Sequence, residues 1–340
     1  MMKKILLLTT LSCLLPAAVW SQTFVQTTIF SMNRFLYNPA AAGYTGATPN
    51  ITGAVRLQWL GIDGAPALTT LAAHTNSERL RGAWGGYAIY DKLGPLATTG
   101  LNLAYAYKIK FKPDDDFSPS LKVGVQLGML QKGVNAVWKY NPIGGIDPLV
   151  GSPGNYSNSL IVPNLGAGLY FSLPGDDKLG GITEVAYVSF SALDLLEPSL
   201  AKLTIDPSKS QARVPRSFYL MGGYKFMLDE RKSIQPNVMF KTDGTSAQFD
   251  VNGMMNIKPM TFGLGYRGTG FSNRRWDSMY ATLGAEILDR LYIGYAYDLT
   301  MSKLSNGGMV NTHELIFSYT FPDVKSVFSP TKNTKGFEEK

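Results

Sequence analysis

The sequence contains two histidines, His74 and His313, and one cysteine, Cys13. Their protonation changes more readily near neutral pH than that of most side chains. A hydrolytic centre would need a histidine beside a nucleophile, and Ser302 or Ser305 near His313 is the nearest approach to such a pair. The strand pattern below places the two histidines at opposite ends of the fold. We therefore interpret both as structural residues at interfaces and predict that the protein is not an enzyme.

Two other patterns are reminiscent of ligand sites but lack the required context. The acidic run at residues 114–116 offers oxygen ligands suited to Ca²⁺, without the glycine and later glutamate of an EF-hand loop. Gly263, Gly265 and Gly268 have the spacing of a dinucleotide fingerprint, but they lie within a predicted strand that no helix follows. We interpret the first as a solvated turn and the second as an aid to packing. The sequence thus predicts neither a metal site nor a cofactor.

Strands are the elements that would position any site, because apolar and polar residues alternate through much of the chain. In residues 291–299, five large apolar residues alternate with Tyr292, Gly294, Ala296 and Asp298. Residues 312–321 repeat the pattern, with Ile316 as the exception on the polar face. Strict alternation places the two sets on opposite faces of a strand. An aromatic and aliphatic face opposite a small or polar one is typical of a membrane barrel.

Fourteen segments are predicted as strands. They are residues 51–60, 67–75, 82–91, 101–109, 121–129, 165–171, 182–190, 218–226, 234–240, 248–257, 261–268, 280–287, 291–299 and 312–321. Connections after even-numbered strands are short, and the two longest, 131–160 and 193–213, follow odd-numbered ones. A short helix is possible at 192–200. An even strand count with short turns on the side of the termini predicts an all-β transmembrane antiparallel barrel of the outer membrane.

The two ends of the chain differ from the strands. Residues 1–21 read as a secretory signal peptide, with small residues predicting cleavage between Ser21 and Gln22. Cleavage removes Cys13 and leaves no thiol. Residues 22–50 predict an ordered segment against or inside the periplasmic end of the barrel, with an unstructured leader as the alternative. Residues 51–321 form the predicted barrel, and 322–340 a periplasmic tail.

Composition agrees with a barrel surrounded by outer-membrane lipid. Only 17% of residues are charged, whereas the chain has 35 Gly, 18 Tyr and 17 Phe. Soluble domains usually carry about 25% charged residues. The formal net charge of +7 is spread over turns. It forms no basic stripe, so nucleic acid is not an expected partner.

The alternation predicts eight charged side chains in the lumen, four of each sign. They are Arg56, Lys108, Lys122, Arg267, Asp250, Glu286, Asp298 and Glu314. A selective pore usually shows one sign at its constriction. Balanced charges can instead pair with each other and fill space. We therefore predict a narrow or blocked barrel, and the alternative is a channel for small or hydrophobic solutes.

Several stretches resemble the PorP/SprF family of outer-membrane proteins of the type IX secretion system of Bacteroidota. The matching stretches are Asn38-Pro39-Ala40-Ala41-Ala42-Gly43, Arg56-Leu57-Gln58-Trp59, Gly61-Ile62-Asp63-Gly64-Ala65-Pro66, Asp91-Lys92-Leu93-Gly94-Pro95, Thr99-Gly100, Tyr105-Ala106-Tyr107, Gly294-Tyr295-Ala296-Tyr297-Asp298, His313-Glu314 and Ser318-Tyr319-Thr320-Phe321. The resemblance spans nearly the whole mature chain, and residues 131–213 depart from it most.

The resemblance implies a non-enzymatic part in secreting or anchoring type IX cargo, including gliding adhesins. The implied partners are periplasmic-ring or peptidoglycan-linked secretion components, or a secreted surface adhesin. The predicted strands place two turns of matching sequence side by side at the outer rim. We predict a partner-binding rim there, together with the two long loops, although turn geometry alone would also require these glycines and prolines. Its residues are Trp59, Asp63, Gly64, Pro66, Asp91, Lys92, Gly94 and Pro95.

Overall fold

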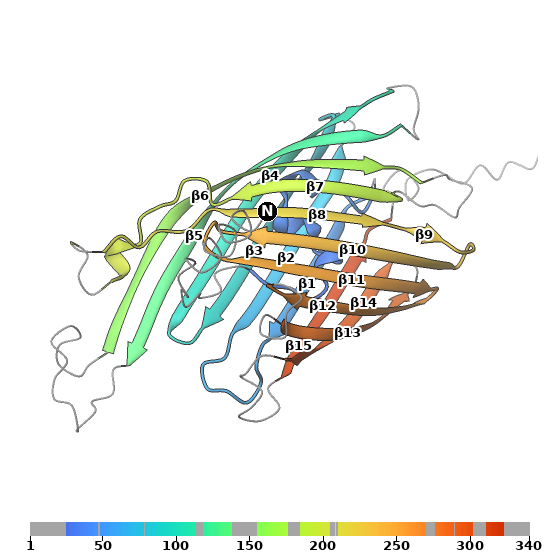
Figure 1. The fold of residues 1–340 in the computed structure, drawn as a ribbon. Coiled ribbons are helices and arrows are strands. Elements are labelled where there is room, and N and C mark those ends of the chain that lie inside the picture. Colours follow the sequence, from blue (N-terminus) through green and yellow to red (C-terminus); the bar gives the residue numbers. More distant parts are fainter. Residues whose placement is uncertain are drawn as a thin grey trace, which may run out of the picture.

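A computed structural model of the protein describes residues 25–46, 48–77, 79–112, 118–137, 155–175, 184–204, 208, 210–269, 276–288, 290–301 and 311–322. The predicted signal peptide, the acidic run at 114–116, Ser302, Ser305 and nearly all of the predicted tail lie outside these residues. The strands form one antiparallel sheet (Figure 1). They are β1 (Asn50–Leu57), β2 (Ala67–Ser77), β3 (Gly82–Leu93), β4 (Leu96–Lys110), β5 (Ser120–Val137), β6 (Asn155–Leu173), β7 (Ala186–Leu193), β8 (Ser217–Tyr224), β9 (Phe226–Met227), β10 (Lys232–Thr242), β11 (Ala247–Ile257), β12 (Met260–Gly268), β13 (Trp276–Ile287), β14 (Leu291–Thr300) and β15 (Asn311–Thr320).

The sheet closes on itself because β1 pairs with both β2 and β15. Asn50 lies opposite Thr320, so the first strand begins and the last strand ends at the same end of the barrel. The short strand β9 continues β8, since both pair with β10. In the described residues the barrel therefore has fourteen strands. This confirms the predicted fold, and the long connections lie at the end opposite to the chain termini, as in bacterial outer-membrane barrels.

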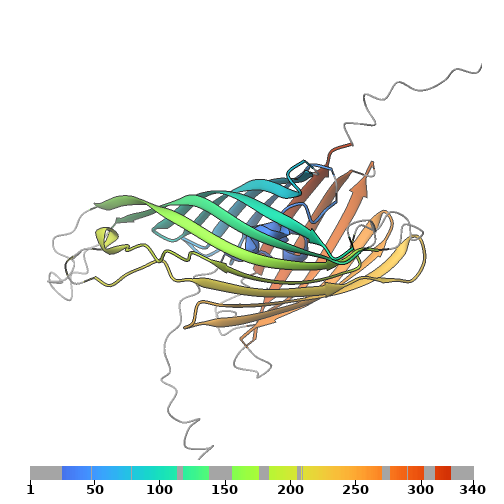
Figure 2. The ribbon, with the colours of Figure 1, turned by 90° about the horizontal axis from the view of Figure 1, so that it is seen from above.

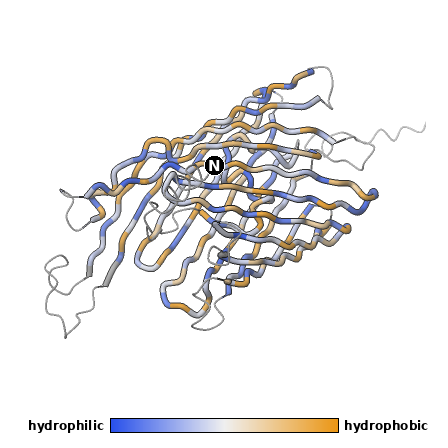
Figure 3. Tube along the Cα trace, in the orientation of Figure 1, coloured by the Kyte–Doolittle hydropathy of each residue, from blue (hydrophilic) through white to orange (hydrophobic). Residues whose placement is uncertain are grey.

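Hydrophobic and hydrophilic residues alternate along the strands (Figure 3). Their side chains alternate between the outer surface and the interior. Leu103 and Leu127 are 67% and 65% exposed, whereas Asn102 and Gln126 are each 1% exposed. In the strand predicted at 82–91, Tyr87 is buried and faces inward. An apolar outer face and a polar inner one are what a lipid-embedded barrel requires.

Several predicted strand boundaries were wrong. Strand β1 ends at Leu57, because Trp59 has a left-handed backbone with a φ of 54°. The predicted 131–160 loop is shorter, since β5 continues to Val137 and β6 begins at Asn155. Polar residues on both faces end the alternation there, while the backbone ladder continues.

No helix forms at 192–200. A 3₁₀ turn, η4 (Ala201–Leu203), follows instead. Asp194 and Glu197 have positive φ angles of 58° and 44°, which a right-handed helix excludes.

Residues 25–46 lie inside the barrel (Figures 1 and 2). They contain η1 (Phe30–Met32), α2 (Arg34–Tyr37) and η2 (Pro39–Ala41). Among the described residues, no helix is long and apolar enough to cross a membrane. Phe30, Phe35 and Tyr37 are buried against the inner wall. Small inward residues on neighbouring strands, such as Ala83 and Ala106, provide the space that this segment occupies.

Candidate functional site

The buried interior, where the N-terminal segment meets the barrel wall, is the candidate site. On one side the segment is held by Asn38, which is fully buried. Its carboxamide oxygen accepts the Ala40 N–H at 2.8 Å and so caps η2. Its Nδ2 donates to the Leu169 carbonyl at 2.9 Å, on β6. A side chain at Gly168 would overlap the Asn38 carboxamide, and one at Gly124 would overlap Ala40. The two glycines therefore let η2 lie directly on the sheet.

We expect Asn38→Ala to loosen the docked segment by about 2 kcal/mol, because the substitution removes a helix cap and a buried hydrogen bond to the wall. The measurement is the rate of tryptic cleavage after Arg34, which is buried in the folded protein. Thr45→Ala is the matched control, since the Thr45 hydroxyl is buried without a hydrogen-bond partner in the described residues. Equal cleavage rates in the two variants would contradict the role of Asn38.

On the opposite side of the barrel the segment is held by Glu314, which is fully buried on β15. One carboxylate oxygen accepts the Thr28 N–H at 2.5 Å, and the other accepts the Ile29 N–H at 3.1 Å. Two successive backbone donors thus converge on one carboxylate. Ile29 also packs against Ile316, the residue that broke the alternation of the last strand. The phase of the strand turns Ile316 inward, and an apolar residue fits there because the N-terminal segment, and not water, lies against it.

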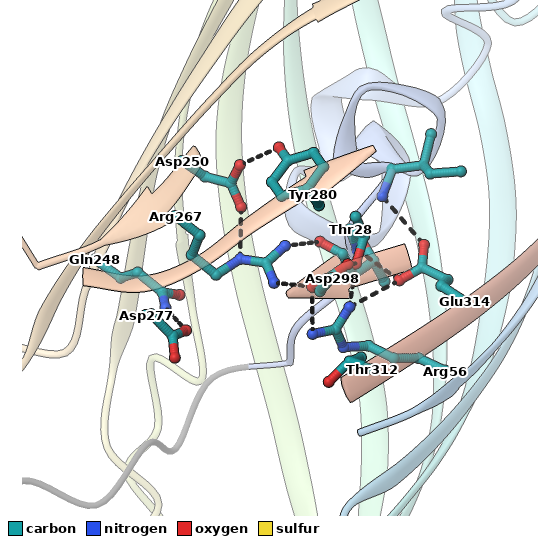
Figure 4. Close-up of polar contacts among 12 residues, drawn as sticks. Thr28, Arg56, Gln248, Asp250, Arg267, Asp277, Tyr280, Asp298, Thr312 and Glu314 are labelled. Atoms are coloured by element: carbon teal, nitrogen blue, oxygen red, sulfur yellow. Dashed lines mark hydrogen bonds and ion pairs between the residues drawn. The ribbon is translucent and has the colours of Figure 1, made fainter. Parts of the chain in front are cut away.

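Glu314 belongs to a network of buried charges (Figure 4). The Arg56 guanidinium lies 3.0 Å from Asp298 and 3.4 Å from Glu314. Arg267 lies 2.8 Å from both Asp250 and Asp298. Asp298 therefore connects the two arginines. Each of these five side chains is at most 4% exposed, so each depends on its partners in place of water.

Strand register brings these charges together. Arg56 lies directly opposite Glu314 in the β1–β15 ladder, and Asp250 opposite Arg267 in the β11–β12 ladder. Opposite charges at facing positions attract across the sheet. The N-terminal segment joins the network, because Arg267 donates to the Thr27 carbonyl at 3.1 Å. A buried network of this kind fixes geometry more than it adds net stability.

A second polar cluster surrounds Arg34 of the N-terminal segment. Its guanidinium donates to the Tyr170 hydroxyl at 2.8 Å and pairs with Glu184. It also lies 3.7 Å from the ring centroid of Tyr187, within the range of a cation–π contact. On the same wall, Lys122 donates to the Ala42 carbonyl at 2.8 Å. The segment is thus held by charged groups on both sides of the barrel.

Six of the eight predicted lumen charges are buried inside: Arg56, Lys122, Asp250, Arg267, Asp298 and Glu314. Lys108 on β4 and Glu286 on β13 are in the inward phase of their strands. Both are exposed near the periplasmic end and lie outside the network. Sequence reasoning missed Lys241, which is 1% exposed on β10. The predicted strand stopped at residue 240, and one more step of the alternation would have included it.

The predicted rim is assembled from two adjoining outer turns. The Gly94 N–H donates to the Gly64 carbonyl at 2.8 Å, so the β1–β2 and β3–β4 turns touch. Both glycines have positive φ angles, 57° and 74°, which favour glycine over other residues. Trp59 is half-buried beside them, and its backbone N–H donates to the Thr312 hydroxyl at 3.3 Å.

The remaining rim residues are divided between solvent and the barrel interior. Asp63, Lys92 and Pro95 are exposed, and Pro66 is half-buried. Asp91 is half-buried and lines an interior cavity. Contrary to the prediction, it does not belong to the exposed rim. The inward phase of β3 explains this, since Tyr87 and Ile89 share the face of Asp91.

Comparison with known protein families identifies the family of this chain. The family model described as "Type IX secretion system membrane protein PorP/SprF" matches residues 19–319. The chain belongs to the PorP/SprF family. The family and the barrel together support an outer-membrane location and a secretion-related role. No curated protein sequence matches the chain.

Three solved barrels resemble this PorP/SprF member at low identity. Omp33 of Acinetobacter baumannii is 7% identical, with 81% of this chain and 98% of that one covered and a TM-score of 0.45. A Pseudomonas aeruginosa FadL homologue is 14% identical, with 83% and 91% covered and a TM-score of 0.41. The TodX deltaS2S3 mutant monoaromatic hydrocarbon channel is 9% identical, with 84% and 93% covered and a TM-score of 0.49.

The histidines of this PorP/SprF protein lie in separate environments. His74 is buried, and its Nδ1 accepts the Gly43 N–H at 3.2 Å, so it helps to hold the N-terminal segment. His313 lies beside Tyr295, whose hydroxyl is 2.6 Å from its Nδ1. In the glycine triplet of β12, a side chain at Gly265 would overlap the Tyr280 ring. That glycine leaves room for a tyrosine, and among the described residues the next element after β12 is the strand β13.

Proposed function

We propose that the protein is a non-enzymatic outer-membrane component of type IX secretion. It holds a secreted partner, such as a surface adhesin, at the outer end of a closed barrel. The periplasmic end would contact ring or peptidoglycan-linked secretion components. The observation that carries this proposal is the interior: the N-terminal segment is bound on both sides of the wall by buried charges. A barrel filled in this way suits a scaffold better than a solute channel.

The outer rim is the proposed attachment surface. Its two turns are fixed to each other by the Gly94–Gly64 hydrogen bond, and they present Asp63 and Lys92 to solvent. A rim of fixed shape loses little conformational entropy when a partner binds. We propose that the two long outer connections belong to the same attachment surface.

We expect the double variant Asp63→Lys, Lys92→Glu to weaken partner attachment about tenfold, since like charges would then face a partner selected for the opposite pattern. Surface-attached cargo is measured in a deletion strain complemented with each variant, together with solute permeability. Thr245→Lys, on an exposed turn between β10 and β11, is the control. Unchanged cargo with altered solute uptake would favour the channel alternative.

We also propose that the signal peptide is removed between Ser21 and Gln22. The expected mature chain begins at Gln22, three residues before the first described residue of the barrel interior. Intact-mass measurement of the purified outer-membrane protein tests this. A mass that retains Cys13, with or without a lipid, would show a different maturation.

A further inference from the structure

A cavity of about 380 Å³ lies above the N-terminal segment, toward the outer end of the barrel. Val25 and Leu36 of the segment form its floor, and Leu200 and Val214 of the long β7–β8 connection line its opposite side. Its volume is within the range of about 300–1,000 Å³ that is usual for ligand pockets. The secretion role proposed above gives this cavity no function.

Two asparagines form a bridge on the wall of this cavity. Asn102 on β4, Gly128 on β5 and Asn164 on β6 are direct neighbours across three strands. The Asn164 Nδ2 donates to the Asn102 Oδ1 at 3.0 Å, across Gly128. A side chain at Gly128 would overlap the Asn102 carboxamide. The glycine is therefore what allows the two amides to meet.

The bridge leaves two polar atoms without partners. Asn102 Nδ2 and Asn164 Oδ1 are buried and make no hydrogen bond in the described residues. The two side chains are only 1% and 5% exposed, and both line the cavity. A single bond between two carboxamides always leaves one amino group and one carbonyl oxygen, whichever way each amide is turned. The cavity wall therefore holds one donor and one acceptor that have no partner among the described residues.

A second asparagine pair in the same barrel shows that such atoms can be satisfied. Asn237 donates to Asn252 at 2.9 Å, at facing positions of β10 and β11. There the remaining Asn237 oxygen accepts from Tyr187 at 3.2 Å and from Gln235 at 3.0 Å. The Asn102–Asn164 pair lacks comparable neighbours and faces a cavity. Buried polar groups normally have partners, and a ligand in the adjoining cavity would supply them.

We propose that the cavity binds an extended apolar peptide segment of the secreted partner, with the N–H and C=O of one of its residues bonded to the Asn102–Asn164 bridge. In an extended segment the N–H and C=O of one residue point to the same side, which complements the free amino group and carbonyl oxygen. The mainly apolar walls accept aliphatic or aromatic side chains. Asp91, Lys132 and Asp194 line the same cavity and supply charges for polar groups of the segment. The choice of a secreted partner rests on the proposed function, while the peptide site does not.

The test uses the full-length protein in detergent and the blocked dipeptide N-acetyl-Leu-Phe-amide as probe, with binding measured by titration calorimetry. We expect Asn102→Leu and Asn164→Leu each to weaken binding about tenfold, and N-methylation of the Leu–Phe peptide bond to do the same. Asn252→Leu is the matched control, because its pair lies outside the cavity, and it should leave the affinity unchanged. Heat-modifiable gel mobility identifies any variant that fails to fold, and Asn164→Ala then replaces it.

Several outcomes would overturn the peptide site. They are the absence of measurable binding, equal affinity for the N-methylated probe, and equal affinity in the asparagine variants. The last outcome would indicate that water, and not a peptide, bonds to the bridge. Binding that appears only after deletion of residues 22–24 would assign the cavity to the chain's own N-terminus. In cells, cargo lost in the rim variant but kept in Asn164→Leu would leave the attachment role intact and refute its use of this site.

Discussion

Asp298→Ala should destabilise the barrel interior by about 3–5 kcal/mol, the cost of removing one member of a buried ion pair. Asp298 accepts hydrogen bonds from Arg56, Arg267 and the Thr28 hydroxyl, and it is 1% exposed. Without it, two guanidinium groups lose the carboxylate that connects them. We expect a lower urea midpoint, followed by tryptophan fluorescence, and rapid tryptic cleavage after Arg34 as the N-terminal segment is released.

Asp229→Ala is the matched control for this variant. Asp229 pairs with Lys232 at 3.3 Å, and both side chains are about half exposed. Exposed pairs contribute about 0–1 kcal/mol, so the control should change the midpoint very little. If Asp298→Ala does not fold, Asp298→Asn retains the shape and removes only the charge. Equal midpoints for the Asp298 and Asp229 variants would show that the network does not hold the segment.

Deletion of residues 25–46 should convert the closed barrel into a conducting one. Barrels of about eight strands are filled by their own side chains, whereas those of about sixteen leave an aqueous channel. A barrel of fourteen strands therefore needs additional material to be closed, and residues 25–46 supply it. Without them, Glu314 and the neighbouring charges would be hydrated. We expect single-channel conductance in planar bilayers to rise by about tenfold or more.

Removal of residues 323–340 is the control for the deletion, because it shortens the chain and leaves residues 25–46 in place. It should leave conductance at the wild-type level. Steady, large conductance of the wild-type protein would contradict the closed interior and return the solute channel to first place. A deletion variant that inserts and remains non-conducting would show that the wall closes without the segment.

The sequence predicted the barrel well because its signal is local. A period of two residues places side chains inside or outside whatever the rest of the chain does. Leu103 and Asn102 lie on the faces that alternation assigns them, and Arg56 and Glu314 both face inward. The turn at Gly64 was equally readable, since few other residues accept its backbone angle. Strand ends were less so, because a ladder such as β5–β6 continues after the alternation stops.

By itself the sequence determined the fold class, the approximate strand count and most of the charges that face inward. Only the tertiary structure decided what those charges meet. Glu314 binds the backbone of Thr28, 286 positions away in the chain, and Ile316 faces inward to contact Ile29. Alternation records the direction of a side chain but not its partner, because the partner is set by closure of the sheet around a segment that has no period of its own. The same closure brings Asn102 and Asn164 together across Gly128.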